Sequence, residues 1–351
     1  MNPYPQTRDR FAATERTACR QPRPMSVLAI ATVSVLCPLL LHAQNKVTPE
    51  DVISALEANN GVHPGERRGF TKGTCAAGEF VGGPTAARYT RSALFSGQPV
   101  PVVARFSVAG GNPKVPDTSK NPRGMALEFR LPDAHLQHMT MSSAPVFGAA
   151  SPQAFLDLTL AMRPDPATGR PDPQRIKAFR ATHPDSAAQA QFLERNNPPV
   201  SYANSAYYSV HAFRFLDRDD GTTLVRWRFV PQDGEKRLTE EELKTAGANF
   251  LEPALIARVK QGPVRWDMML TIGQPGDPEN DPTLAWPDSR LTLKVGTLSL
   301  TSASPQKGAE CERINFDPMV MADGISATED PILRLRAAAY AISFAKRLSG
   351  E

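Results

Sequence analysis

The last helix-like stretch of the sequence carries an arginine and a tyrosine at a spacing that could do chemistry. In DPILRLRAAAYAISFAKR, residues 330–347, Arg336 precedes Tyr340 by four positions. Residues four apart lie on one face of a helix, so the Arg336 guanidinium can reach the Tyr340 phenol oxygen and favour its ionised form. A phenolate is a hard ligand for ferric iron. The same spacing is also common in surface pairs that contribute little, so both interpretations stay open on these residues alone.

Strand-forming segments occupy the middle of the chain and must supply the surface against which such a helix packs. They are rich in β-branched and aromatic residues and end at turn residues. The fourth follows the third closely, and the two are predicted to form a hairpin around Asp220-Gly221. The segments are PVPVVARFSV, GMALEFRL, YYSVHAFRFLD, TTLVRWRFV, GPVRWDMMLTIG and RLTLKVGTLSL.

Helical segments flank these strands. Thr48 caps a predicted helix that has Pro49 in its first turn and ends at Gly61. Further helical pieces are predicted in SPQAFLDLTLAM, around PDPQRIKAFRA, and in RLTEEELKTAGANFLEPALIARVK, where Thr239 and Glu242 form a capping box. The succession of elements predicts an α+β domain built on an antiparallel sheet or barrel.

The N-terminus has the pattern of a signal peptide. Five arginines precede the apolar run SVLAIATVSVLCPLLL, which is short for a bilayer span and is interrupted by Pro38. We therefore expect residues 1–43 to be a signal peptide cleaved near Ala43, residues 44–351 to be one exported domain, and the protein to be periplasmic without a stable membrane anchor. Whether translation starts at Met1 or Met25 stays open.

Net charge and cysteine content limit the possible ligands and the possible state of the thiols. The whole chain carries +4, of which residues 1–43 account for +3, so a mature chain of +1 is an unsuitable partner for nucleic acid. Cys75 and Cys311 remain after cleavage and have no metal-type spacing. Either a disulfide or two buried thiols is compatible with the sequence.

Several blocks together resemble the catalase family. The run NFDPMVMADGISATEDPILRLRAAAY resembles the haem-ligand region of catalases, with an FDP element, a GI turn and then Arg-x-x-x-Tyr. Other blocks follow in the family's order from about Gly61 to Tyr340, so the similarity covers nearly all of the mature chain. They are RYTRSALFSGQPVPVVARFSVAGGNPKVPDTSKNPRGMALEFR, SSAPVFGAASPQAF, HAFRFLDRDDGTTLVRWRFVPQDGEKRLTEEE and PDSRLTLKVGTLSL.

The resemblance implies an eight-stranded antiparallel β-barrel with flanking helices. It also implies that haem b is held between the barrel and the helix of Tyr340, in a domain spanning residues 44–351. Because the chain ends soon after Tyr340 and begins with a signal pattern, it is similar to the compact, exported subgroup called catalase-related peroxidases.

Site residues carry over position by position. By the resemblance, Tyr340 is the axial iron ligand and Arg336 its charge partner and a catalytic group. Four further residues carry over, and each could also have a purely structural role, as a surface or buried arginine, a strand serine or a core phenylalanine. They are Arg67 and Arg105, matched to arginines that pair with the haem propionates, Ser107, matched to a serine of the distal pocket, and Phe155, matched to an aromatic against the macrocycle.

The distal side departs from the family pattern. In FTKGTCAAGEF, Phe70 occupies the place of the catalytic histidine, and in SSAPVF, Ser143 occupies that of the distal asparagine, so both are expected beside the cofactor. The histidine moves a proton between the two oxygens of a peroxide, a step that phenylalanine cannot perform. A phenylalanine instead makes the pocket apolar, which favours organic over small polar peroxides.

Another histidine could replace the missing one. His63 is nearest in sequence, and His135 and His138 are a second choice. His211 aligns with a strand histidine of the family and is expected in the core, and His183 is expected in solvent.

These residues lead to a hypothesis of weak haem peroxidase activity. We expect hydroperoxide reduction, more readily of organic hydroperoxides, with an unknown small reductant as partner. A non-catalytic haem carrier or sensor is the main alternative, and a haem rearrangement or oxygen-transfer catalyst is a further one. The oligomeric state is not predicted.

Overall fold

A closed ring of antiparallel strands forms the centre of the computed structural model, which describes residues 46–351. The predicted leader, residues 1–43, lies outside the described residues. The strands are β1 (Gly73–Gly82), β2 (Pro99–Val108), β3 (Arg123–Arg130), β4 (Leu136–Ser142), β5 (Tyr207–Tyr208), β6 (Phe213–Leu216), β7 (Thr222–Pro231), β8 (Val264–Ile272), β9 (Thr292–Pro305) and β10 (Ile325–Ala327).

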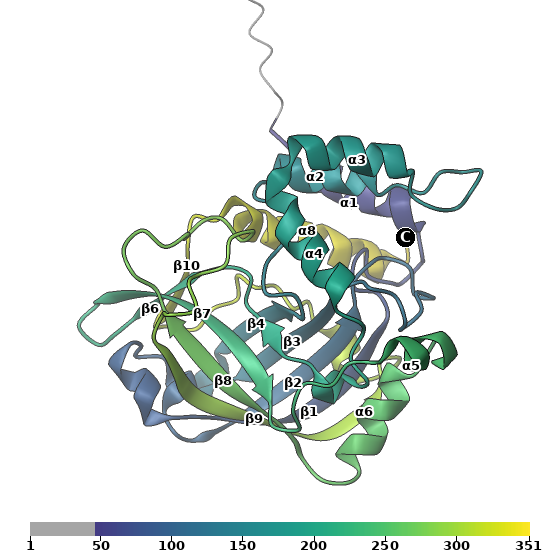
Figure 1. Cartoon of the computed structure of the whole chain (residues 1–351). Coiled ribbons are helices and arrows are strands. Elements are labelled where there is room, and N and C mark those ends of the chain that lie inside the picture. The colour runs from purple at the N-terminus through teal and green to yellow at the C-terminus, as the bar shows by residue number, and fades with distance from the viewer. Residues whose placement is uncertain (1–45) are drawn as a thin grey trace, which may run out of the picture. The chain divides into compact units, whose positions relative to one another are not determined.

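Eight of these strands close on themselves. Their order is β7-β5-β4-β3-β2-β1-β9-β8, and a pairing between β7 and β8 completes the ring. Strands β6 and β10 extend the sheet outward from β7. The prediction of an eight-stranded antiparallel barrel is therefore confirmed, and Figure 1 shows it below a group of helices.

Strand alternation divides the side chains between the barrel interior and its outer face. On β2, Phe106 points into the core, where its ring lies 5.3 Å from that of Tyr202 and 5.7 Å from that of Trp266. Arg105 and Ser107 on either side of it line a cavity outside the barrel. Because the side-chain period of a strand is two, one strand serves both the core and the outer wall.

The helices cover the outer wall above β2, β3 and β4. Figure 1 shows α8, the terminal helix, running beneath α1, α2 and α3, and α8 packs against both α1 and α2. None of the helices in the described part of the chain combines the length and apolar character that crossing a bilayer requires. The helices are α1 (Pro49–Asn60), α2 (Pro152–Ala161), α3 (Pro173–Thr182), α4 (Ala187–Arg195), α5 (Glu240–Thr245), α6 (Leu251–Val259), α7 (Glu310–Arg313) and α8 (Pro331–Ser349).

Local signals placed most of these elements. Thr48 caps α1 and Gly61 ends it, and the Thr239–Glu242 capping box is present at α5. The hairpin turns at Asp217–Gly221 between β6 and β7, with Asp220 in the left-handed region at φ 62°. The long predicted helix around residue 246 is two helices, α5 and α6, and the predicted strand over residues 207–217 is two short ones, β5 and β6. Helices α4 and α7 and strands β4 and β10 were not predicted.

Cys75 and Cys311 form a disulfide, which decides between the two alternatives left open by the sequence. The bond joins β1 to α7 across 236 residues of chain, and it sits in a small cluster with Val103 and Phe316 on the outer face of the barrel. Closing a loop of this length restricts the unfolded chain by about 5 kcal/mol in the loop-entropy account.

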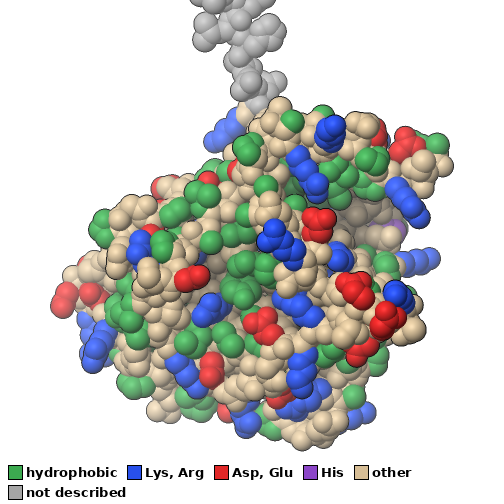
Figure 2. Space-filling view, in the orientation of Figure 1, with side chains coloured by type: hydrophobic (Ala, Val, Ile, Leu, Met, Phe, Trp, Pro, Cys, Tyr) green, Lys and Arg blue, Asp and Glu red, His purple; other side chains and the backbone are tan. Residues whose placement is uncertain are grey.

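Charged groups of both signs are spread over the surface. On the face drawn in Figure 2, lysine and arginine side chains are interspersed with aspartate and glutamate rather than gathered into one patch.

The barrel interior yields a stability prediction at Phe80. Its fully buried ring contacts those of Phe95, Phe129 and Phe229 at centroid distances of 6.0, 5.4 and 6.4 Å. Phe80→Ala should lower the free energy of unfolding by about 3–5 kcal/mol, because it leaves a cavity in a closed barrel that cannot collapse. Urea denaturation followed by circular dichroism would measure it. The matched control Leu348→Ala, at a side chain 71% exposed, should change that free energy by less than about 0.5 kcal/mol.

Candidate active site

A cavity of about 540 Å³ lies between the outer face of the barrel and helix α8. Strands β2, β3 and β4 form one wall, α8 forms the opposite wall, and α1 and α2 close the sides. Most of its lining is apolar, with a few charged groups. Seven of the eight predicted site residues line it: Phe70, Arg67, Arg105, Ser107, Phe155, Arg336 and Tyr340.

The α8 wall presents the pair that the sequence singled out. Arg336 Nη2 donates a hydrogen bond of 2.7 Å to Tyr340 Oη and another of 2.8 Å to Thr140 Oγ1 on β4. The guanidinium carbon also lies 5.2 Å from the centroid of the Tyr340 ring. Thr140 fixes the guanidinium from the barrel side, so the guanidinium group is held against the phenol oxygen of Tyr340.

A buried histidine and aspartate stand behind this pair. His211 Nδ1 lies 2.7 Å from Asp330 Oδ2, and the other oxygen, Oδ1, caps α8 by accepting from the amides of Ile332 at 2.8 Å and Leu333 at 3.2 Å. Burial lowers the pKa of His211, and the nearby Arg336 charge lowers it further, while the hydrogen bond to Asp330 opposes both. Asp330 thus fixes the start of α8 and the orientation of a neutral imidazole at the cavity wall.

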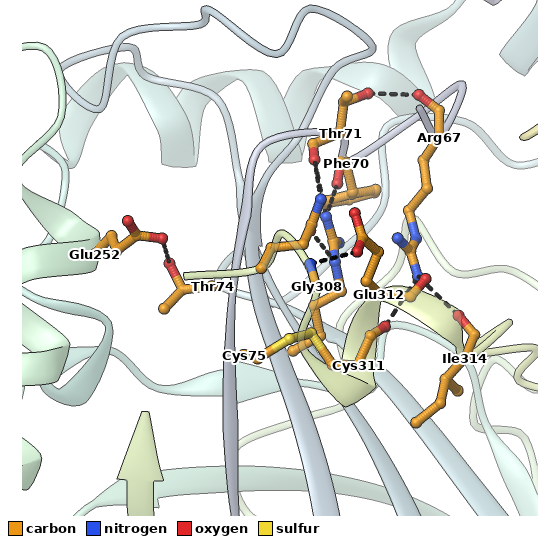
Figure 3. The surroundings of a disulfide bond; sticks show 12 residues. Arg67, Phe70, Thr71, Thr74, Cys75, Glu252, Gly308, Cys311, Glu312 and Ile314 are labelled. Atoms are coloured by element: carbon orange, nitrogen blue, oxygen red, sulfur yellow. Dashed lines mark hydrogen bonds between the residues drawn. A yellow bond between two sulfur atoms is a disulfide. The ribbon is translucent and has the colours of Figure 1, made fainter. Parts of the chain in front are cut away.

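One end of the cavity gathers three arginines. Arg67 Nη2 donates to the carbonyl oxygens of Cys311, Glu312 and Ile314 at 3.2, 3.3 and 2.7 Å, as Figure 3 shows in part. Arg347 Nη1 donates to the same Glu312 carbonyl at 2.6 Å. On the barrel side, Arg105 is the third.

Arg105 is held entirely by neutral acceptors. Its Nε donates to Gln306 Oε1 at 2.7 Å, and its Nη2 donates to the carbonyls of Phe70 and Thr71 at 2.7 and 2.9 Å. Gly73 leaves room for it, because a Cβ at that position would lie 2.5 Å from Nη2. No carboxylate forms an ion pair with Arg67, Arg105 or Arg347 within the described residues.

The electrostatics of this end call for an anion. Burial lowers the pKa of Arg67 to about 8, and repulsion from Arg105 and Arg347 adds to the effect. Burial likewise lowers the pKa of Arg105 to about 10 and depresses that of Arg347. The nearby carboxylates of Glu66 and Glu312 offset only part of this effect on Arg67. Three forked cations meeting at one end of a cavity form a site for carboxylates, which would relieve both desolvation and mutual repulsion.

The distal wall is made by Phe70 and Ser107. A Cβ built on Gly124 would lie 2.9 Å from Ser107 Oγ and 3.1 Å from the Phe70 ring, so both side chains sit over this glycine. Phe70 has φ 53°, a left-handed conformation that a bulky residue rarely adopts. The chain therefore holds an aromatic ring at the cavity wall at some cost in backbone strain.

The remaining predicted groups are placed differently. Ser143 does not line the cavity, because its hydroxyl accepts from the amide of Arg123 at 2.9 Å, while its neighbour Ser142 does line it. Among the histidines of residues 46–351, His211 alone reaches the cavity wall. His63 bonds to the Asn60 carbonyl, His138 lies between Glu128 and Asp317, and His135 is exposed. His183 lies beside Asp157.

These residues fit haem. The cavity has the volume of a small-molecule site and apolar walls for a flat macrocycle. A phenol oxygen held by an arginine faces it from one side, and three unpaired cations stand at one end, where two propionates need partners.

Sequence reasoning missed Arg347 and gave His211 only a core role. Arg347 lies seven residues beyond Tyr340 in α8. Seven residues make two helical turns, so the spacing itself places Arg347 on the face of Tyr340 and could have identified it. The His211–Asp330 contact joins residues 119 apart, and no local pattern predicts it.

Comparison with known proteins gives a consistent result. The sequence profile of the Catalase family matches residues 50–351. The chain is 55% identical to the "Catalase-related peroxidase" of Synechococcus elongatus over 92% of this chain and 96% of that protein. It is 34% identical to the protein of the same name from Mycolicibacterium paratuberculosis, over 85% and 94%.

Solved catalases share the fold. A bacterial catalase superposes with a TM-score of 0.75 at 24% identity, covering 82% of this chain and 58% of that one. Catalase A from Saccharomyces cerevisiae also gives a TM-score of 0.75, at 23% identity over 82% and 62% of the two chains. This chain therefore spans about three fifths of the length of these larger proteins.

The buried histidine gives a pH prediction for the haem-free protein. The fold keeps His211 neutral, whereas the unfolded chain binds a proton below about pH 6.5, so stability should be lost as the pH falls below that value. His211→Gln should remove up to about 1.4 kcal/mol per pH unit from the slope of unfolding free energy between pH 6.5 and 5. Urea titrations at several pH values would measure it. The exposed control His135→Gln should keep the parent slope, and equal slopes in His211→Gln and the parent would contradict the assignment.

Proposed function

The chain belongs to the catalase family and is a haem peroxidase of the catalase-related type, and on that premise we propose that it reduces organic hydroperoxides more readily than hydrogen peroxide. Reduction of a hydroperoxide to an alcohol and water consumes two electrons and two protons. We propose that a small soluble reductant supplies the electrons. The observation that carries the proposal is the Arg336–Tyr340 hydrogen bond on one cavity wall, facing a wall that holds Phe70 in place of a proton-transfer group.

Haem is the group that this cavity would hold, and haem b is our proposal for its form. We assign Tyr340 as the iron ligand, and we assign Arg67, Arg105 and Arg347 to its two propionates. Haem bound there supplies the iron at which the oxygen–oxygen bond of the hydroperoxide is broken. Phe155 on α2 lines the cavity 5.5 Å from the Phe147 ring, and this aromatic pair would pack against the edge of the macrocycle.

The proximal residues hold negative charge on the Tyr340 oxygen. Arg336 donates to that oxygen at 2.7 Å and is itself fixed by Thr140. His211 and Asp330 lie further back, where the aspartate orients the imidazole and caps the helix that carries Tyr340. A ligand held as a phenolate increases electron density at the metal, which is the role we propose for this half of the site.

The distal residues bind and orient the substrate but supply little proton transfer. Phe70 cannot accept a proton. Ser107 offers a hydroxyl that stays un-ionised near neutral pH and is therefore a very weak base. The hydroxyl can still orient a hydroperoxide oxygen by a hydrogen bond. The apolar ring excludes water and contacts an alkyl group, so an organic hydroperoxide gains more from this wall than hydrogen peroxide does.

We also propose export to the periplasm and a mature domain of residues 44–351. The charged and apolar pattern of residues 1–43 supports cleavage of a leader. The Cys75–Cys311 disulfide supports an oxidising compartment, where such bonds persist.

The iron ligand can be tested by absorption spectroscopy. The haem-loaded protein should show the spectrum of a ferric phenolate complex, and Tyr340→Phe should lose that spectrum and release haem at least about tenfold faster, because the ring keeps its shape but has no oxygen. Tyr208→Phe, on β5 and outside the cavity lining, is the matched control. An unchanged spectrum in Tyr340→Phe would show that another side chain holds the iron.

The distal assignment can be tested by restoring a base. Histidine adopts left-handed backbone more readily than phenylalanine, so Phe70→His should fold with the same φ of 53° and less strain. We expect the rate with hydrogen peroxide to rise by about 10²-fold, since general acid–base catalysis contributes 10²–10⁴-fold. Oxygen release measured with an oxygen electrode and oxidation of a dye reductant measured by absorbance would check it. An equal or lower rate would contradict the distal role of residue 70.

The parent protein provides the remaining control in the same assay. Haem-loaded parent protein should turn over an alkyl hydroperoxide faster than hydrogen peroxide. If it bound haem but consumed neither, it would be a haem carrier or sensor rather than a peroxidase.

A further inference from the structure

The Cys75–Cys311 disulfide lies directly beside the three-arginine end of the cavity. Cys75 on β1 pairs in register with Arg105 on β2, so the two residues are neighbours on the outer face of the barrel. Figure 3 shows the sulfurs next to the backbone of α7, whose carbonyl oxygens receive Arg67. Both sulfurs are buried, with Cys311 0% and Cys75 5% exposed.

A single short segment, residues 306–314, supplies acceptors to all three arginines. Gln306 Oε1 accepts from Arg105 at 2.7 Å. The carbonyls of Cys311, Glu312 and Ile314 accept from Arg67, and that of Glu312 accepts from Arg347 as well, at 2.6 Å. We call residues 306–314 the acceptor segment. Its position fixes Arg67 and Arg347 and supports Arg105, whose Nη2 is held by Phe70 and Thr71 outside the segment.

The segment contains one short helix and directly follows strand β9, whose Pro305 pairs with Thr74 on β1. Helix α7, at its centre, has four residues, which is far below the length at which a helix is stable by itself. Glu312 Oε2 accepts from the Gly308 amide at 2.7 Å, and this contact is internal to the segment. Beyond that strand, three features tie the segment to the barrel: the buried disulfide, a small apolar cluster around Phe316, and an ion pair of 2.6 Å between Glu310 and Arg130 at the end of β3, which is exposed and therefore weak.

We propose that the Cys75–Cys311 disulfide is a positioning element for the arginine site and that firm retention of the haem carboxylates requires it. Without the bond, the acceptor segment can move away from β1. Arg67 and Arg347 then lose shared acceptors and, because like charges repel, turn toward water. This inference rests on the proposed assignment of the three arginines to haem propionates.

The proposal also orders events in maturation. The polypeptide must form the disulfide before its arginine site is complete, so haem is retained firmly only after the chain reaches an oxidising compartment. Forming the bond transfers two electrons and two protons from the two thiols to a dithiol-disulfide oxidant of that compartment.

The test compares haem loss from the parent and from Cys75→Ala/Cys311→Ala. Haem-loaded protein is mixed with excess apomyoglobin, and transfer is followed by absorbance. The double variant should release haem about tenfold faster or more, the equivalent of one charge-assisted hydrogen bond, while keeping the phenolate spectrum. Leu255→Ala, a fully buried α6 position outside the cavity lining, is the control for lost stability alone and should release haem at the parent rate.

A modified cofactor separates positioning from general loosening. Haem with both propionates converted to methyl esters lacks the anions that the arginines bind. With this ester, the parent and the double variant should release the cofactor at the same rate. A tenfold difference that persists with the ester would show that the disulfide acts through fold stability and would overturn the proposal.

A reversible experiment covers the case in which the double variant does not fold. A trialkylphosphine reduces the disulfide of the parent, giving its electron pair to the sulfurs while a water molecule provides the two protons and the oxygen of the phosphine oxide. Reduced parent should release haem faster, and reoxidation should restore the slow rate. Equal rates for both forms would overturn this inference alone, whereas a parent protein that never binds haem would overturn the proposed function.

Discussion

The site depends on one face of α8 lying against the outer wall of a closed barrel. Arg336, Tyr340, Ser343 and Arg347 follow one another at spacings of four, three and four, so they share this face and all line the cavity. At 1.5 Å of rise per residue, Tyr340 and Arg347 are separated by about 10 Å along the axis. One rigid element therefore fixes both the phenol oxygen of Tyr340 and the guanidinium group of Arg347. Asp330 fixes the start of that element and, through His211, joins it to the strand side.

The Tyr340 side and the Phe70 side of the cavity differ in polarity and in how firmly their side chains are held. The Tyr340 side is polar, and its groups are joined by hydrogen bonds, since Arg336 donates to Thr140 as well as to Tyr340. On the opposite side, the ring of Phe70 faces the cavity. The backbone of this residue is left-handed, a conformation that histidine adopts more readily than phenylalanine. The backbone at residue 70 thus adopts a conformation that a phenylalanine side chain does not favour. An unfavourable conformation persists where the surrounding structure determines it, and here Thr71 on one side donates its amide to Gly110.

Much of the fold was predictable because it depends on local patterns. Alternation on β2, the Thr48 cap and the Asp220-Gly221 turn are each encoded within a few residues, and the order of the blocks fixed the barrel. The Arg336–Tyr340 contact is also local, because helical periodicity determines it. Contacts between distant segments were not predictable, since pairing Cys75 with Cys311 requires knowing that β1 and α7 meet. Ser143 shows where the resemblance failed. Its position aligns with a site residue of the family, but its hydroxyl accepts from the Arg123 amide instead of facing the cavity.

The arginine end links cofactor binding to the stability of the fold. Three guanidinium groups repel one another there, Arg105 buried and Arg67 and Arg347 half-buried, and their hydrogen bonds within the chain go to neutral carbonyl and amide oxygens. The carboxylates of Glu66 and Glu312 offset part of the cost without forming ion pairs with them. Carboxylates bring charge as well as acceptors, so any ligand that supplies them binds the folded chain and not the unfolded one. The folded state is therefore stabilised by the anion it selects. A cluster that is costly when empty is also selective, because a neutral ligand of the same shape would leave the repulsion between the cations uncompensated.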